Sequence, residues 1–341
     1  MRTIKTRKRI VAAVMAVGLG ATLSACADDD DSASSSSSGC TSDSSAMGQL
    51  DNSDHKAATA ANPGTRGKAR TAPRTASPKD EITLAIIPSW TDGVSTAYLW
   101  KHVLEDEGYT VNIEELADAA PLYTGLANGD FDVYPSAWPE VTHKKYMDEY
   151  GDDLETLGDY YDGAVLTMAV PEYTDVDSIA DLPDNADKFD DRIVGIEPGA
   201  GLTGVMKDST IPTYCLEDFD FVTASTPAML TELEKAIKAK EDIVVTLWRP
   251  YWANNEFPVK DLEDPEGAMG EPEPLSEVAN KDFSGEFPDV AEMMSKAKLD
   301  DEQYGSLEDL VVNKYGEGKE EQAVDEWLKQ NPDWLKSIGA Q

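Results

Sequence analysis

The sequence predicts an α/β fold for the part of the chain that follows residue 80. Strand-like apolar runs alternate there with helix-like runs, a pattern typical of parallel strands covered by helices on both faces. The chain has 341 residues, of which 40% are hydrophobic, so two domains can each fill a core. No apolar run after residue 19 is long enough to span a bilayer as a helix.

The first half of this region predicts three strands that alternate with two helices. The mostly apolar residues 81–87 predict a buried strand, and residues 94–107 place their apolar side chains on one helical face. The elements that follow are a strand at 110–114, a short helix at 122–127 and a strand at 131–134.

The second half resumes the alternation and ends in helices. The expected elements are strands at 165–170, 192–196, 221–224 and 243–247, a helix from near residue 200 and a helix at 227–240. Thr226 is the expected N-cap of the last of these helices, and Pro227 occupies its first position. From about residue 289 the chain is expected to be mainly helical, with Trp327 and Trp334 in the core.

The first 80 residues have the features of an export signal followed by a tether. A basic stretch at residues 2–9 precedes an apolar run at 10–19, and Leu23-Ser24-Ala25-Cys26 resembles a bacterial lipobox. We therefore expect a lipoprotein signal peptide at 1–26 with lipidation of Cys26; the alternative is an ordinary signal peptide. Residues 27–80 have few large apolar side chains, which predicts a disordered tether that places the folded part outside the membrane.

Negative charge is concentrated in the part that is expected to fold. The formal net charge is −37, and residues 81–341 contain 58 acidic and 18 basic side chains. Such an acidic domain repels phosphate backbones, and its sequence contains no basic patch. The composition therefore argues against a nucleic-acid partner.

The three cysteines leave one question open. If Cys26 is lipidated, Cys40 and Cys215 either pair in a disulfide or remain two free thiols. An extracytoplasmic location permits the disulfide, although Cys40 lies in the predicted tether.

The motif search favours a binding protein over an enzyme. Residues 199–204 match G-x-G-x-x-G between a predicted strand and a helix, but the next strand is followed by Ser225 rather than by the acid that binds a ribose. We interpret these glycines as a tight strand-to-helix turn. His102 and His143 have no His or Cys partner nearby, so they are expected to be solvated or structural. We expect no catalytic residue, no metal and no cofactor.

Aromatic residues occur where three predicted strands end. Trp90, Trp138 and Trp248 each follow a strand, and Phe219 precedes another. Ligands of α/β sheets bind outside the carboxyl ends of strands, although each Trp alone would more simply cap the core. Converging aromatic faces hold a quaternary ammonium, which has no N–H to donate, at about 0.5–2 kcal/mol per ring.

A candidate anion site follows the first strand. At Asp92-Gly93-Val94 the predicted strand gives way to a helix, whose free N–H groups at Gly93 and Val94 suit a carboxylate. A cage for a cation together with a site for an anion predicts a zwitterionic ligand.

With these residues the sequence resembles the glycine betaine/proline betaine substrate-binding lipoproteins of ABC transporters. The stretches that carry the resemblance are WTDGV (90–94), AW (137–138), GIEPGAG (195–201), IVVTLWRPYW (243–252) and DLEDP (261–265). The resemblance implies a two-lobed periplasmic-binding-protein-like fold of type II, with the ligand in the cleft between the lobes. It places lobe I at 81–163 and 251–341 and lobe II at 164–250.

The resemblance also implies roles for individual residues. It assigns the aromatic cage to Trp138, Trp248 and Phe219, with Trp90 as a further candidate, and Phe219 stands where relatives have Trp. It assigns the ligand carboxylate to the amides of Gly93 and Val94 together with the residue at position 251. Tyr251 stands there in place of the His of relatives, and Arg249 is the alternative donor.

The expected function is that of an extracytoplasmic, lipid-anchored solute receptor. As a monomer it would bind glycine betaine or a related quaternary ammonium osmolyte and deliver it to an ABC permease with a separate ATPase for osmoprotective uptake. Choline, carnitine or another methylated amine is the alternative ligand. An envelope-tethered hydrolase and a receptor that docks to a membrane sensor are the alternatives of other classes.

Overall fold

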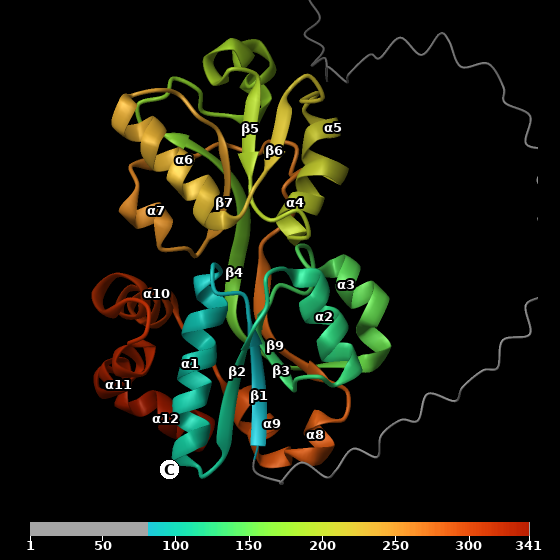
Figure 1. Ribbon diagram of the computed structural model, residues 1–341, viewed down its shortest axis with the longest axis vertical. Helices are drawn as coiled ribbons and strands as arrows, with labels where there is room; N and C mark the ends of the chain where they lie inside the picture. Colours follow the sequence, from blue (N-terminus) through green and yellow to red (C-terminus); the bar gives the residue numbers. More distant parts are fainter. Residues whose placement is uncertain (1–80, 341) are drawn as a thin grey trace, which may run out of the picture. The chain divides into compact units, whose positions relative to one another are not determined.

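The computed structural model describes residues 81–340 (Figure 1). The predicted signal peptide and tether, with Cys26 and Cys40, lie outside the described residues. Cys215 is disulfide-bonded, so a free thiol at this position is ruled out. Among residues 81–340 no helix is both long enough and apolar enough to cross a bilayer.

One mixed sheet in the order β2-β1-β3-β9-β4-β7-β5-β6, with β8 paired to β4, runs through the described part of the chain. The strands are β1 (Glu81–Ile86), β2 (Thr110–Glu115), β3 (Val133–Ala137), β4 (Leu154–Pro171), β5 (Arg192–Gly195), β6 (Asp220–Thr223), β7 (Val245–Arg249), β8 (Val259–Asp261) and β9 (Glu273–Asn280).

The long strand β4 divides the sheet into the two lobes of a type II binding-protein fold (Figure 1). Its residues 154–164 pair with β9, and together with β1, β2 and β3 they form lobe I. Its residues 165–171 pair with β7 and β8 and, with β5 and β6, form lobe II. Because β8 still pairs with β4, the chain returns to lobe I between β8 and β9, later than the boundary expected at residue 251.

Helices cover both lobes. Those of lobe I pack on the sheet as follows: α1 lies against β1, β2 and β3, α2 against β3 and β9, and α9 against β4, while α10 and α11 pack on α1. The helices are α1 (Thr91–Asp106), α2 (Ala119–Asn128), α3 (Lys144–Tyr150), α4 (Gly201–Val205), α5 (Ile211–Thr213), α6 (Thr226–Ala239), α7 (Ala253–Glu256), α8 (Phe283–Glu286), α9 (Pro288–Lys296), α10 (Asp301–Asp309), α11 (Glu320–Gln330) and α12 (Pro332–Ile338). A π-helical turn, Met206–Thr210, joins α4 to α5.

The expected elements appear where local hydrophobicity is high. The strands expected at 81–87, 110–114, 192–196 and 221–224 correspond to β1, β2, β5 and β6. Trp327 and Trp334 are core residues, with 0% and 4% of their surfaces exposed. The cap of α6 is one residue earlier than expected, because the side chain of Ser225 accepts a hydrogen bond from the Ala228 amide.

Two strand segments differ from the sequence expectation. The first half of β4 has few fully buried residues and several polar ones, and β9 contains Glu273 and Glu277. Both acids are buried, so composition alone hides the strand. These two strand segments make the sheet mixed rather than parallel, because β9 is antiparallel to β3 and to β4.

The buried carboxylate of Glu273 fixes the turn that follows β3. It accepts hydrogen bonds of 2.9 Å from each of the backbone amides of Glu140, Val141 and Thr142, and a further one from the Thr142 hydroxyl. Backbone donors thus replace a cation as the partner of this buried acid. The turn carries Trp138 at its start and His143 at its end.

We predict that Glu273→Gln destabilises the fold, because the amide group of Gln presents N–H donors to backbone donors. The expected loss is about 1–3 kcal/mol of unfolding free energy, measured by chemical denaturation. Glu271→Gln is the matched control, since Glu271 is an exposed acid two residues away. Equal stability of the two variants would contradict the role given to Glu273.

Candidate functional site

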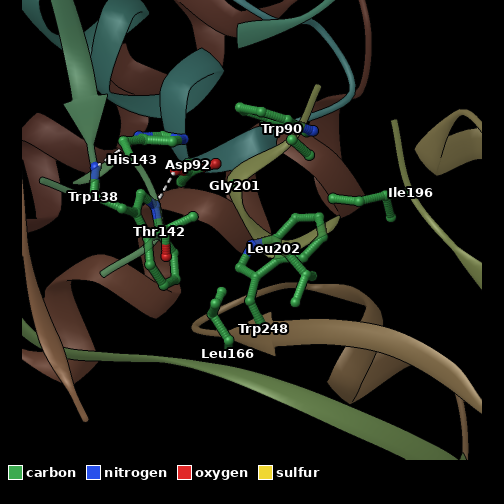
Figure 2. Close-up of a pocket in the computed structure, with 11 residues that line it drawn as sticks. Trp90, Asp92, Trp138, Thr142, His143, Leu166, Ile196, Gly201, Leu202 and Trp248 are labelled. Atoms are coloured by element: carbon green, nitrogen blue, oxygen red, sulfur yellow. Dashed lines mark hydrogen bonds between the residues drawn. The ribbon is translucent and has the colours of Figure 1, made fainter. Parts of the chain in front are cut away.

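A pocket lies between the lobes and takes residues from both (Figure 2). Its empty volume, which includes open solvent at the mouth, is about 340 Å³. Lobe I contributes Trp90, Asp92, Trp138, Thr142 and His143, and lobe II contributes Leu166, Ile196, Ala200, Gly201, Leu202 and Trp248. Pockets that are largely apolar and carry a few polar groups are typical of small-molecule binding sites.

Three indole rings from three strand ends meet in this pocket (Figure 2). Trp90 is the N-cap residue of α1 after β1, Trp138 follows β3 directly, and Trp248 belongs to β7. Leu166 of β4 is the register partner of Trp248, so the two side chains lie next to each other. Phe219 is buried before β6 but does not line the pocket.

The amides expected to hold a carboxylate do not face this pocket. The Val94 N–H donates to the carbonyl of Trp90 inside α1, and the Val94 side chain lines a different hollow. Gly93 lies within 4 Å of the side chains of Tyr134 and Ser136, measured from where its Cβ would be. Neither residue lines the space between the indoles.

Tyr251 and Arg249 have structural partners instead. The Tyr251 ring stacks on Trp248 with 4.0 Å between ring centroids, and the side chain is buried behind the pocket wall. Burial raises the pKa of its hydroxyl well above the ordinary value. Arg249 forms an ion pair with Asp261 and does not line the pocket.

The start of α4 lies at the pocket. Gly201 and Leu202 are the first residues of this helix, and both line the pocket. The first amides of a helix have no carbonyl partner within the helix, so they point outward as donors. The sequence had identified this turn only as a strand-to-helix connection.

His143 is a neutral donor in the pocket wall. Its Nδ1 accepts a hydrogen bond of 3.1 Å from the Trp138 amide, so the ring proton is on Nε2. Burial lowers the pKa of His143 to about 3, with the nearby Lys145 acting in the same direction. The imidazole also stacks on Trp90 at 6.0 Å. Sequence reasoning missed this role because a lone His has no partner motif; its place five residues after Trp138 was the available signal.

Asp92 is a buried acid in the same wall. It accepts hydrogen bonds from the Ser136 hydroxyl at 2.6 Å and from the Trp138 indole N–H at 3.1 Å. Burial raises the pKa of Asp92, while these two donors oppose the shift. Tyr160 extends the network through a hydrogen bond with Ser136 at 2.8 Å. Within residues 81–340 no Lys or Arg forms a salt bridge with Asp92, so a cationic ligand would be its first positive partner.

Residues 80–330 match the family model described as the substrate binding domain of ABC-type glycine betaine transport systems. The chain belongs to this family, OpuAC. That description is of a transport component rather than an enzyme. Two curated relatives are a glycine betaine/carnitine transport binding protein of Listeria monocytogenes, 32% identical over 44% of this chain and 49% of the relative, and a glycine betaine/proline betaine-binding periplasmic protein of Escherichia coli, 26% identical over 50% and 56%. The chain thus spans about half the length of these relatives.

Solved structures of the same family share the fold. Lactococcal OpuAC, closed and complexed with glycine betaine, is 30% identical, covers 76% of this chain and 99% of its own, and has a TM-score of 0.69. A glycine betaine/L-proline-binding protein of Borrelia burgdorferi is 26% identical over 76% and 96%, also with a TM-score of 0.69. The two-lobed type II fold expected from the sequence is confirmed by these neighbours.

We predict that burial of neutral His143 makes stability fall in acid. The unfolded chain takes up a proton below about pH 6.5, whereas folded His143 does so only near pH 3. The contribution of this residue is therefore complete above pH 6.5 and decreases toward pH 3. At pH 5 the loss is about 2 kcal/mol relative to pH 7.

The measurement compares His143→Gln with wild type by chemical denaturation from pH 8 to pH 5. Other buried acids titrate in both proteins and cancel in the difference. The difference in unfolding free energy should shrink by about 2 kcal/mol over this range. A difference that stays constant with pH would show that His143 is not held neutral.

Proposed function

We propose that this protein is the extracytoplasmic receptor of an ABC importer and binds glycine betaine or a related quaternary ammonium osmolyte. The observation that carries the proposal is the meeting of Trp90, Trp138 and Trp248 in a pocket between the lobes. A quaternary ammonium cannot donate hydrogen bonds, so aromatic faces are the partners that attract it. The complex of lactococcal OpuAC with glycine betaine supports this ligand.

The carboxylate of the ligand would bind at the lobe II side of the pocket. We assign this role to the amides of Gly201 and Leu202 at the start of α4 and to the Nε2–H of His143, because these three residues line the pocket. These three replace the expected set of Gly93, Val94 and Tyr251. Tyr251 instead supports the Trp248 ring by stacking, and we assign Phe219 no contact with the ligand.

Choline is a second candidate ligand, and Asp92 favours it. A buried carboxylate in the pocket wall attracts a ligand that carries net positive charge, as choline does. A zwitterion must bring its own carboxylate into the same pocket, where the His143 and α4 donors have to separate it from Asp92. The two ligands therefore differ in what they require of Asp92: choline is attracted by its negative charge, whereas the carboxylate of glycine betaine has to be kept away from it.

The cellular setting follows from the sequence and the family. We infer export through the segment 1–26, a lipid anchor on Cys26 and delivery of the ligand to a permease with a separate ATPase. The acidic surface of the folded part suits a hydrated extracytoplasmic domain that acts as a monomer. Because osmolyte uptake matters at high salt, an osmoprotective role fits this ligand class.

We predict that the protein binds glycine betaine and proline betaine but not glycine, because glycine carries an ordinary ammonium group that prefers water to aromatic faces. Trp138→Ala and Trp248→Ala should each weaken glycine betaine binding by at least about tenfold, measured by isothermal titration calorimetry. Trp334→Phe is the control, since Trp334 packs on Trp100 and Trp327 in the core. Glycine binding equal to that of glycine betaine would overturn the proposal.

Asp92→Asn separates the two candidate ligands. For choline the substitution removes the charge that attracts the cation, so affinity should fall at least about tenfold. For glycine betaine the loss should be smaller, because the carboxylate of the ligand no longer meets a like charge. If the affinity for choline exceeds that for betaine in wild type and falls in Asp92→Asn, choline is the ligand and the betaine assignment is wrong.

A further inference from the structure

The turn between β5 and α4 belongs to lobe II and contacts lobe I. It comprises residues 197–201, and Ala200 and Gly201 at its end line the ligand pocket. The pattern of glycines here is the one that matched a dinucleotide-binding turn by sequence alone. The structure gives these glycines another purpose, because lobe I lies against them.

Glu197 connects the lobes at one end of the turn. Its carboxylate accepts hydrogen bonds from the Thr226 amide and hydroxyl, both at 2.8 Å, within lobe II. It also accepts bonds from the Ser89 hydroxyl and the Trp90 indole N–H, both at 3.3 Å, from lobe I. The bonds to Thr226 hold the carboxylate in place in lobe II, so the other two form when the lobes approach.

Gly199 is held by lobe I in the middle of the turn. Its N–H donates to the Asp118 carboxylate at 3.0 Å, and its carbonyl accepts from the Tyr146 hydroxyl at 2.7 Å. A Cβ on Gly199 would lie only 2.5 Å from an Asp118 carboxylate oxygen, and one on Gly201 would lie 1.8 Å from the Thr142 carbonyl oxygen. While the lobes are in contact, a side chain at Gly201 would clash with backbone, and one at Gly199 would displace the Asp118 carboxylate.

We propose that residues 197–201 form the latch that holds the lobes together around the ligand, with Glu197 as a positioning residue for the Trp90 ring. The proposal rests on the proposed function insofar as closure encloses a bound solute. It adds that absence of a side chain at Gly199 and Gly201 is a condition of closure. It also adds that closure fixes one wall of the pocket, because the Trp90 N–H finds its partner only in lobe II.

The test is the Gly199→Ala variant, because Gly199 does not line the pocket. Calorimetry should show glycine betaine binding weakened about tenfold or more, since the methyl group displaces Asp118 and the two hydrogen bonds of Gly199. Small-angle X-ray scattering should show a larger radius of gyration than wild type at the same ligand concentration. Thermal stability without ligand should change little, because the strained contact disappears when the lobes separate.

Two further variants keep the test falsifiable. Gly204→Ala is the matched control, because Gly204 lies in α4, directly after the turn, and a Cβ there meets no atom within 4 Å; binding and scattering should match wild type. In an Asp118→Ala background the Gly199→Ala change should cost much less, because the obstructing carboxylate is gone. An equal cost in both backgrounds would overturn the proposal.

The role of Glu197 is tested in a background that lacks the Trp90 indole N–H, the group that Glu197 positions. Glu197→Gln should weaken glycine betaine binding in wild type and have a clearly smaller effect in Trp90→Phe, which keeps an aromatic ring but lacks the N–H. Equal effects in both backgrounds would show that Glu197 is only structural.

Failure of the proposed function is distinguishable from failure of the latch. If wild type binds no quaternary ammonium compound, the proposed function fails. Scattering of the ligand-free variants then decides the latch alone: a larger radius of gyration for Gly199→Ala than for Gly204→Ala supports it, and equal radii overturn it.

Discussion

The pocket depends on buried carboxylates whose partners are hydrogen-bond donors rather than cations. Glu273 fixes the turn that carries Trp138 and His143, Asp92 receives the Trp138 indole N–H, and Glu197 receives that of Trp90. The two indole bonds restrict the rotation of the Trp138 and Trp90 rings, which would otherwise be held by packing alone. Because unpaired carboxylates are costly to bury, the rings and the acids stabilise one another's positions.

This arrangement explains how an acidic protein can offer a selective pocket. The many exposed acids are hydrated and screened over about 8 Å at physiological ionic strength, so they contribute little to the electrostatic potential inside the pocket. Inside the pocket, by contrast, the polar groups are few and fixed: the Asp92 carboxylate, the neutral His143 and the first amides of α4. Selectivity for a methylated cation therefore resides in the rings, and selectivity for its other end in these few groups.

Three tryptophans that the sequence singled out line the pocket, whereas the residues whose amides it assigned to a carboxylate do not. An aromatic residue directly after an apolar strand is a local signal, and parallel strands deliver their ends to one edge of the sheet, so Trp90, Trp138 and Trp248 were identifiable. The polar half depends on which helix start faces the pocket. In our proposal this is α4 in lobe II rather than α1, and the path of β4 and β9 between the lobes places α4 at the pocket.

Buried acids were the other feature that sequence could not reveal. Among 58 acidic side chains after residue 80, Glu273, Glu277 and Glu197 look like members of a solvated surface. Their burial makes β9 unrecognisable by composition and conceals the contacts that hold the lobes together. The glycine pattern at 199–204 also matches a dinucleotide-binding turn for a related reason, since close approach of a protein backbone and of a phosphate both require a missing side chain.

The central claim is that the pocket attracts the positive charge of a quaternary nitrogen through aromatic faces. Calorimetric titration with glycine betaine and with tert-butylacetate, in which carbon replaces that nitrogen, tests it most directly because shape and carboxylate are kept. The account predicts that tert-butylacetate binds at least about tenfold more weakly, since three rings lose a cation worth about 0.5–1 kcal/mol each or more. Equal affinities would mean that the pocket recognises apolar shape alone and would contradict the account.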